Sequence, residues 1–474
     1  MNRRFVLGFI FLVFANFCGQ SQAAPRPPNI VFLFADDLGW GDLACYGHPY
    51  AKTPNLDRLA SEGTRFTQCY ATGVTCCPSR TGFMTSKLPA TFKGYPANAG
   101  FSARATVSEL LKQHGYATGH FGKWHIGPET KAGTYGFDVI GADADDETGG
   151  KRKAARTERG RDALIYDSAI RFIEQHKDGP FYVNVWGHIS HHPINPSPAL
   201  VAAFGPLTVD ETKFPPEMRE KFALCKKLGA DVSTHLRAYL AEVKSMDDDA
   251  GRLLKRLDEL GLRENTIVVF SSDQGPAPLR DPADANEKQK AKAKARFQGD
   301  GAPGSDVRLN AMGFAGPFRG GKHNQYEGGV RIPFIVRWPG HVTAGRVDEK
   351  SVLSGADWLP TLCTLTGAKF NSADCDGESA AAAWLGQPFT RTKLLLWKAS
   401  NPRADVAIRD GDWKLHWSNG KRGDVELYDI ARDAREAQNV ATQYPDVVKT
   451  LTAKVEKWNA TLPTEYIKAD DKLD

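Results

Sequence analysis

Continuous hydrophobic runs alternate with helical patterns over the first three quarters of the chain. Four of these runs predict buried strands, at residues 30–34, 181–186, 266–270 and 332–336. Continuous apolar strands that alternate with helices are typical of a parallel sheet with both faces covered. The pattern therefore predicts an α/β fold with a large, mostly parallel sheet sandwiched by helices.

Capping residues predict where three of the helices begin and end. One follows the first strand, with Thr53 as its cap, Pro54 in its first turn and Gly63 past its end. Another covers residues 106–113, where Thr106 and Glu109 form a capping box. A long amphipathic pattern over residues 236–260 stops at Gly261 and predicts a third helix.

Beyond about Gly386 the pattern changes to short runs at residues 394–397, 406–409, 413–417 and 425–428. Asp410-Gly411-Asp412 is a turn signal between two of these runs, and a helical pattern follows at residues 445–459. These features predict a small antiparallel sheet with one helix against it. We therefore expect a large α/β domain at residues 24–385 and a C-terminal α+β subdomain at residues 386–474.

The N-terminus predicts an exported protein. A basic Met-Asn-Arg-Arg start, an apolar run from Phe5 to Phe14 and a small-residue site at Ser21-Gln22-Ala23 indicate a signal peptide, residues 1–23. The apolar run is shorter than the roughly 20 residues that span a bilayer, so we expect no membrane span. The destination is the periplasm, the medium or, in a eukaryote, the lysosome.

Charge and cysteine content narrow the function classes. The formal net charge is +5, two units of which belong to Arg3 and Arg4, so no case for a nucleic-acid partner follows. Export leaves seven cysteines, of which Cys363 and Cys375 are close enough in sequence to pair. Without a C-x-x-C pair, metal binding by cysteines is not expected.

Two polar insertions, at residues 143–161 and 283–296, interrupt the pattern. We interpret both as solvated loops. The second insertion allows an alternative, a guide for a polyanionic substrate, because it carries Lys288, Lys290, Lys292, Lys294 and Arg296.

Carboxylates follow two predicted strands directly. Asp36 and Asp37 come after the first strand, and Asp273 and Gln274 come after the strand at 266–270. Loops at the carboxyl ends of strands line the crevice of doubly wound sheets. Three carboxylates and an amide oxygen suit a hard cation, Ca²⁺ or Mg²⁺, and not zinc. A metal would also relieve the repulsion between adjacent carboxylates.

The segment Cys76-Cys77-Pro78-Ser79-Arg80 is the most specific motif in the chain. A buried structural thiol or half of a disulfide are the ordinary roles for Cys76, but neither gives the proline and arginine a purpose. From about Asn29 to about Val440 the chain resembles the formylglycine-dependent sulfatases of the alkaline-phosphatase-like superfamily. The resemblance implies that Cys76 is converted to formylglycine by a formylglycine-generating enzyme, and that residue 76 also contacts the metal.

The resemblance implies a role for further residues. Hydrated formylglycine attacks sulfur and is later regenerated by elimination. Two of these residues lie in Gly122-Lys123-Trp124-His125. Lys123 would contact the sulfate and the formylglycine, and His125 would assist the elimination. Alternation along an extended segment would put both side chains on one side. If a helix begins near Pro78, Arg80 could face back toward residue 76.

Two more residues complete the expected site. By resemblance, His191 in His191-His192-Pro193 protonates the departing alcohol, a role that suits a histidine pKa near neutrality, with His188 and His192 as rivals. Lys322 precedes Tyr326-Glu327-Gly328-Gly329 and would bind sulfate. Gln274 departs from the family, which usually has Asn or His there, so its role as a ligand is the weakest expectation.

We therefore expect a metal-dependent hydrolase of an alcohol or carbohydrate sulfate. Two alternatives stay open: a phosphate or phosphonate ester hydrolase of the same superfamily, and a protein that binds sulfated glycans without catalysis because Cys76 is unconverted. The sequence does not identify the sulfate ester.

Overall fold

The computed structural model describes residues 26–93, 100–101, 104–127, 131–141, 158–279, 307–398, 405–418 and 425–464. The predicted signal peptide at 1–23, the insertion at 283–296 and most of the insertion at 143–161 lie outside these residues.

In the described part of the chain, nine strands form one central sheet. Eight lie in the order β4-β3-β5-β1-β6-β7-β2-β8, and β9 pairs with β2. Pairing is parallel except that β7 is antiparallel to both β6 and β2. The strands are β1 Asn29–Ala35, β2 Thr64–Tyr70, β3 Ala117–Gly122, β4 Val139–Gly141, β5 Phe181–Trp186, β6 Thr266–Ser272, β7 Arg331–Arg337, β8 Arg346–Asp348 and β9 Leu353–Ser354.

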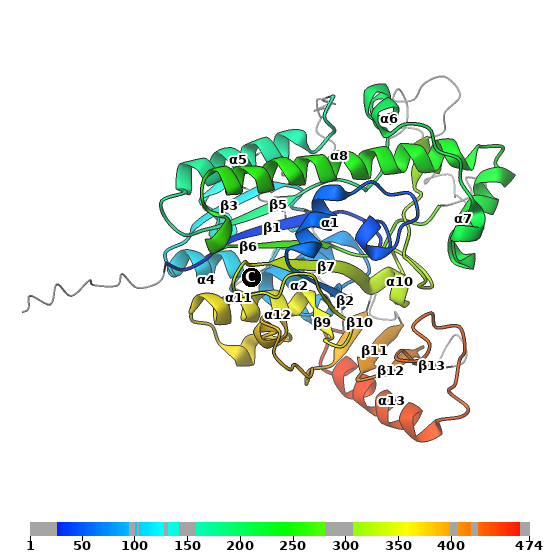
Figure 1. Ribbon diagram of the computed structural model, residues 1–474. Coiled ribbons are helices and arrows are strands. Elements are labelled where there is room, and N and C mark those ends of the chain that lie inside the picture. The colour runs from blue at the N-terminus through cyan, green and yellow to red at the C-terminus, as the bar shows by residue number, and fades with distance from the viewer. Residues whose placement is uncertain are drawn as a thin grey trace, which may run out of the picture.

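Helices cover both faces of this sheet (Figure 1). On one side lie α1 Pro54–Ser61, α5 Ala163–His176, α6 Pro198–Phe204, α7 Pro216–Lys227 and α8 Val232–Glu259. On the other lie α2 Cys76–Thr85, α4 Val107–Gln113, α11 Trp358–Thr366 and α12 Ala381–Trp384. The short helix α10, Glu327–Val330, leads into β7.

Single turns of 3-10 helix occur in the connections: η1 Ala44–Tyr46, η2 Pro89–Thr91, η3 Thr134–Gly136, η5 Glu211–Lys213, η6 Arg263–Asn265, η8 Val307–Asn310, η9 Gly355–Asp357 and η10 Ser372–Asp374.

Strand β1 shows why the sequence pattern is continuously apolar. Val31, Leu33 and Ala35 pack into the core on the α8 side. Their neighbours Ile30, Phe32 and Phe34 pack into the core on the α11 side. Successive side chains of a strand point to opposite faces, so every position of a strand covered on both faces is buried and most positions are apolar.

A second sheet of four antiparallel strands is formed by a late part of the sequence and lies beside α13, at the lower right of Figure 1. Leu415, Leu427, Leu451 and Val455 form its core with α13. The opposite face, with Trp397 and Ala407, packs on Tyr70 and Val330 of the main domain. The elements are β10 Leu395–Lys398, β11 Val406–Asp410, β12 Trp413–Trp417, β13 Glu426–Asp429 and α13 Pro445–Asn459.

The fold class is the predicted one, and the differences are local. Helix α8 begins at Val232, before the predicted 236, because Asp231 caps it by accepting from the Thr234 amide at 2.7 Å. The run at 332–336 is an antiparallel strand, which periodicity alone does not distinguish from a parallel one. The seven described cysteines are free thiols, so Cys363 and Cys375 are not paired.

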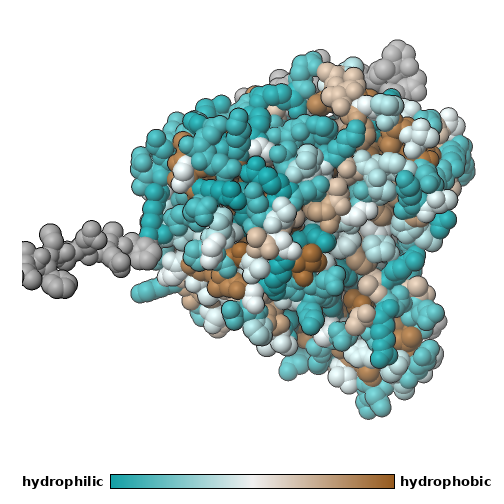
Figure 2. All heavy atoms as spheres, viewed as in Figure 1, coloured by the Kyte–Doolittle hydropathy of each residue, from teal (hydrophilic) through white to brown (hydrophobic). Residues whose placement is uncertain are grey.

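The face shown in Figure 2 is mostly hydrophilic, with hydrophobic residues in small separate groups. Within the described residues, no helix combines the length and the hydropathy that a membrane crossing requires.

The N-terminus of α1 is capped from another helix, not by Thr53. The Thr53 side chain makes no cap bond and instead accepts from the Ala44 amide at 2.9 Å. Buried Asp247 of α8 accepts from the Asn55 and Leu56 amides at 3.1 and 2.8 Å. Asp247 therefore ties α1 to α8.

We expect Asp247→Ala to lower the free energy of unfolding by about 2–4 kcal/mol, because it leaves buried helix amides without an acceptor. The matched control is Asp248→Ala, since Asp248 is exposed and pairs with Lys244 within α8. Urea denaturation of both variants checks this. Equal losses in the two variants would contradict the cap.

Candidate active site

Six neighbouring strands deliver polar residues to one edge of the central sheet. Strands β1 and β6 are paired in parallel with Ala35 opposite Ser272, so Asp36–Asp37 and Asp273–Gln274 leave the sheet side by side. The flanking strands bring Lys123 after β3, His191 after β5 and Cys76 after β2. Because β7 runs in the opposite direction, the segment before it, with Lys322, reaches the same edge.

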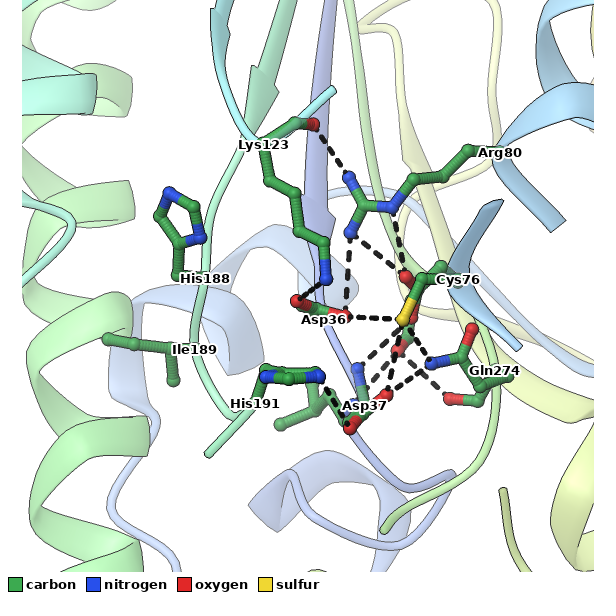
Figure 3. A network of polar contacts seen from close by, with 12 residues as sticks. Asp36, Asp37, Cys76, Arg80, Lys123, His188, Ile189, His191 and Gln274 are labelled. Atoms are coloured by element: carbon green, nitrogen blue, oxygen red, sulfur yellow. Dashed lines mark hydrogen bonds and ion pairs between the residues drawn. The ribbon is translucent and has the colours of Figure 1, made fainter. Parts of the chain in front are cut away.

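Three carboxylates and one thiol form the centre of this edge (Figure 3). One ligand atom from each of Asp36, Asp37, Asp273 and Cys76 lies within 4.8 Å of the others, and all four residues are buried. The Asp37 amide donates to Asp273 at 3.0 Å, which ties the two loops together. The sequence-predicted acidic residues therefore meet as expected.

Three buried cations surround the carboxylates. Arg80 lies 2.9 Å from Asp273 and 3.7 Å from Asp36, and also donates to the Lys123 carbonyl at 2.8 Å. Lys123 Nζ lies 2.7 Å from Asp36, and Lys322 Nζ lies 2.8 Å from Asp37. The site thus balances three acidic side chains with three basic ones.

Cys76 is the first residue of α2, which begins two residues before the predicted start near Pro78. The next turn of α2 brings Arg80 back toward it, as expected. Cys76 Sγ donates to Asp36 Oδ1 at 3.3 Å and accepts from Lys322 Nζ, also at 3.3 Å. Burial, reinforced by Asp36, raises the pKa of this thiol well above its usual value. The sulfur is therefore protonated and a weak nucleophile.

The carboxylates differ in their preference for protons. Burial alone would raise the pKa of Asp36, but Lys123, His191 and Arg80 hold it well below its ordinary value. Burial, together with the neighbouring Asp36, raises the pKa of Asp273 to about 7. Burial also raises the pKa of Asp37, and the nearby charge of Lys322 offsets only part of this rise. Two of the three carboxylates therefore retain protons more readily than free aspartate does.

The donor set fits a hard divalent cation. Asp36, Asp37 and Asp273 offer oxygen ligands within one small space. Gln274 Nε2 donates to Asp37 and to Cys76, while its Oε1 is buried with no hydrogen-bond partner among the described residues. Exchanging the two amide atoms would turn this oxygen toward the carboxylates. Asp36, Asp37, Asp273 and Gln274 are thus the residues that would hold the ion.

His191 lies at the edge of the cluster, with Nε2 3.9 Å from Asp37 Oδ2 (Figure 3). Its Nδ1 donates to the His192 carbonyl at 2.8 Å, so in the neutral ring Nε2 faces the site without a proton. Burial lowers the pKa of His191 well below its usual value, which corrects the expectation of a pKa near neutrality. The side chain of its rival His188 has no contact drawn to this network in Figure 3.

His125 departs from the predicted geometry. Strand β3 ends at Gly122, and His125 has a φ of 57°, in the left-handed region. Strand alternation therefore does not place Lys123 and His125 on one side, because β3 ends before Lys123. Lys123 reaches the cluster, and His125 is half-buried.

Arg161 and Asp162 organise the histidine loop, and the sequence analysis missed both. Arg161 donates to the carbonyls of His188 and His191 at 2.7 and 2.6 Å. Asp162 accepts from the His188 amide at 3.0 Å. Their place at the end of a polar insertion gave no signal, because the contacts are to main-chain atoms of a distant loop.

Comparison with known proteins identifies a family for this arrangement. The family model described as Sulfatase matches residues 28–368, which is more than half of the chain. A model described as the C-terminal region of N-sulphoglucosamine sulphohydrolase matches residues 320–461.

Individual proteins agree with these matches. The chain is 29% identical to an N-acetylgalactosamine-6-O-sulfatase of Bacteroides thetaiotaomicron, over 91% of this chain and 93% of the relative. It is also 29% identical to human arylsulfatase A, over 90% and 87% of the two chains. The crystal structure of Ps i-CgsB in complex with k-i-k-neocarrahexaose superposes with a TM-score of 0.73 at 22% identity, covering 94% of this chain and 95% of that one, and shows the shared fold.

Ca²⁺ should raise the melting temperature of the purified protein, and Asp37→Asn should abolish this shift because it removes a ligand oxygen charge. Binding displaces the protons retained by Asp273, whose pKa is about 7. Affinity should therefore fall as the pH drops below about 7, by about tenfold per displaced proton per pH unit. Calorimetric titration at pH 6 and pH 8 checks the sign. Tighter binding at pH 6 would contradict this assignment.

Proposed function

The chain belongs to the sulfatase family and is a sulfuric ester hydrolase, and we propose that its working site is the cluster around residue 76, converted from cysteine to formylglycine. The observation that carries this proposal is the position of Cys76. Its sulfur lies between the acidic cluster and Lys322, within 3.3 Å of a carboxylate oxygen and of the lysine nitrogen. A nucleophile at this position faces both the negative charge of the acidic cluster and the positive charge of Lys322.

The unmodified thiol does not suit the reaction. Burial and Asp36 keep it protonated, and a sulfated thiol would have no internal route to release sulfate. Hydrated formylglycine supplies a hydroxyl nucleophile and a second hydroxyl whose deprotonation expels sulfate. The Cys76-Cys77-Pro78-Ser79-Arg80 motif supports conversion by a formylglycine-generating enzyme during maturation.

A divalent cation, Ca²⁺ or alternatively Mg²⁺, supplies positive charge at the carboxylates and makes a nearby hydroxyl easier to deprotonate. Asp36, Asp37, Asp273 and Gln274 would hold it, with residue 76 as a further contact. The oxygen character of this set favours a hard ion over zinc.

Arg80, Lys123 and Lys322 stabilise negative charge on the sulfate. All three are buried, so water screens their charges poorly. Their positions are fixed before substrate arrives, because each is already bonded to a carboxylate or a carbonyl. A fixed donor of this kind is worth roughly 3 kcal/mol to the transition state.

His191 is the proposed acid for the departing alcohol. Its Nδ1 proton is committed to the His192 carbonyl, so the exchangeable proton must be carried on Nε2, which points toward the cluster. The surroundings of the half-buried His191 lower its pKa and favour the neutral ring, so we propose that protonation accompanies substrate binding. His125, by family resemblance, assists the regeneration step.

We propose a sulfated carbohydrate as the substrate, with N-acetylgalactosamine 6-sulfate as the first compound to test. The similarity to an N-acetylgalactosamine-6-O-sulfatase over nearly the whole of both chains supports this choice. An exported location, periplasmic, secreted or lysosomal, agrees with the N-terminal pattern of the sequence.

Conversion of Cys76 is directly measurable. After co-expression with a formylglycine-generating enzyme, the tryptic peptide that contains residue 76 should weigh about 18 Da less than its cysteine form, because carbonyl replaces thiol. Cys76→Ala should lose sulfatase activity at least 1000-fold, by order of magnitude. Cys77→Ala is the matched control, since Cys77 packs in the hydrophobic core on the α11 side. An active Cys76→Ala enzyme would rule out the proposed nucleophile.

The phosphate and phosphonate alternative is tested with paired nitrophenyl esters. We expect the sulfate ester to be cleaved faster than the phosphate ester, because the chain belongs to the sulfatase family. Release of inorganic sulfate from N-acetylgalactosamine 6-sulfate, measured by ion chromatography, extends the test to sugars. Faster cleavage of the phosphate ester would contradict the proposed reaction and favour the phosphate or phosphonate alternative.

A further inference from the structure

Two sequence segments that take no part in the proposed chemistry meet inside the protein. Glu327, in Tyr326-Glu327-Gly328-Gly329, begins α10 of the main domain, and Lys414 lies on β12 of the C-terminal sheet. Lys414 Nζ lies 2.9 Å from Glu327 Oε1, and both side chains have no exposed surface. The contact joins the two sheets across 87 residues of sequence.

The pair belongs to a larger buried set of charges. Glu436 accepts from the Glu327 amide at 2.6 Å and lies 3.1 Å from Lys414 Nζ. The other carboxylate oxygen of Glu327 accepts from the Tyr70 hydroxyl at 2.7 Å. Burial would raise the pKa of Glu327, but Lys414, Arg331 and Arg409 lower it to about 2, so the carboxylate is ionised. Buried ion pairs are poor contributors to stability, so a role in fixing geometry merits a test.

The residues after Glu327 are packed against the loop that carries Lys322. The Gly328 amide donates to the Arg319 carbonyl at 2.8 Å. A Cβ on Gly328 would lie 2.6 Å from that carbonyl oxygen, and one on Gly329 would lie 2.5 Å from the Gly321 oxygen. The Lys322 loop therefore rests directly on the backbone of α10, with no room for a side chain between them.

The same turn touches the loop that carries Gln274. The Gly275 amide donates to the Gly329 carbonyl at 2.9 Å, and a Cβ on Gly275 would overlap the Gly328 carbonyl. The Lys322 amide donates to the Pro276 carbonyl at 2.9 Å. Backbone contacts thus connect the turn that begins with Glu327 to the loops that carry Lys322 and Gln274.

The C-terminal sheet holds the Lys322 segment at further points. Gln325 Nε2 donates to the Trp397 and Asp405 carbonyls at 3.1 and 2.8 Å. The Tyr326 hydroxyl donates to Glu426 at 2.9 Å. These bonds reach β10 and the start of β11 on one side of β12, and β13 on its other side. Lys414 of β12 is the only lysine of the described C-terminal strands that binds Glu327.

Strand alternation directs Lys414 to the main domain. Its neighbour Leu415 packs into the core beneath α13. Lys414 therefore points from the opposite face of β12, toward Glu327. The two residues differ by one position but act on different sides of the sheet, which makes Leu415 a useful control.

We propose that Lys414 is a positioning residue for Lys322: the C-terminal sheet uses it to hold Glu327 and α10, and α10 in turn holds the Lys322 loop against Asp37 and residue 76. This inference rests on the proposed function, in which Lys322 binds the sulfate. It assigns to the C-terminal sheet a part in catalysis without any contact to substrate.

A double-mutant cycle on the formylglycine-containing enzyme tests the positioning role. Lys322→Ala should lower kcat/KM by about 100-fold and Lys414→Met by about 10-fold. Residues that act through one another are not additive, so the double variant should fall by about 100-fold and not about 1000-fold. All proteins are assayed on one nitrophenyl sulfate at a temperature where near-UV circular dichroism shows them folded.

Leu415→Ala separates positioning from stability. It should lower the melting temperature of the protein and leave kcat/KM within about twofold of wild type, because it leaves a cavity in the core on the far face of the sheet. If Lys414→Met does not fold, Lys414→Arg replaces it in the double-mutant cycle. Arginine keeps the positive charge but places it at a different distance from Glu327.

An additive cycle, or an equal loss of activity in Leu415→Ala, would overturn the positioning role. A converted wild-type enzyme without sulfatase activity would instead contradict the proposed function. In that case the quantity measured for each variant of the cycle is the rise in melting temperature that inorganic sulfate causes. Loss of that shift in both Lys322→Ala and Lys414→Met supports positioning, and loss in Lys322→Ala alone overturns it.

Discussion

The site depends on the balance between three buried carboxylates and three buried cations at one edge of the sheet. Asp36, Asp37 and Asp273 are brought so close that they repel one another, and burial adds to the cost of their charge. Arg80, Lys123 and Lys322 offset that cost, each through a contact of 3.0 Å or less. The same six groups are suited to hold a divalent ion on one side and a sulfate group on the other.

The fold creates this balance through strand order. The parallel pair β1 and β6 places two acidic loops side by side, and the flanking strands β5 and β3 add the histidine loop and Lys123. The reversed strand β7 matters as much, because only an antiparallel strand brings the segment before it to this edge. Lys322 reaches the cluster for that reason.

Much of this could be predicted from the sequence, because local signals set the elements. Strand β5 and helix α13 have their predicted limits, since apolar runs and a proline at a helix start are short-range features. The order of the strands depends on contacts between distant residues and could not be read from the pattern. The direction of His125 was missed because β3 ends at Gly122, and both Gly122 and His125 have a positive φ that breaks the alternation. The Lys414–Glu327 contact was missed because the sequence pattern does not distinguish a buried lysine on a short strand from an exposed one.

The position of Cys76 connects the family resemblance to the physical chemistry. A protonated thiol enclosed by carboxylates and lysines is a poor nucleophile, whereas the same position suits an oxygen nucleophile beside a metal ion. The conversion of this residue and the binding of the ion are therefore two parts of one proposal.

Anomalous X-ray diffraction from crystals of the converted protein grown with Ca²⁺ tests that proposal most directly. The account predicts one strong peak bounded by Asp36, Asp37, Asp273 and Gln274, with residue 76 in contact as an oxygen-bearing side chain. An ion bound elsewhere, or no ion at this site in the presence of saturating Ca²⁺, would contradict it.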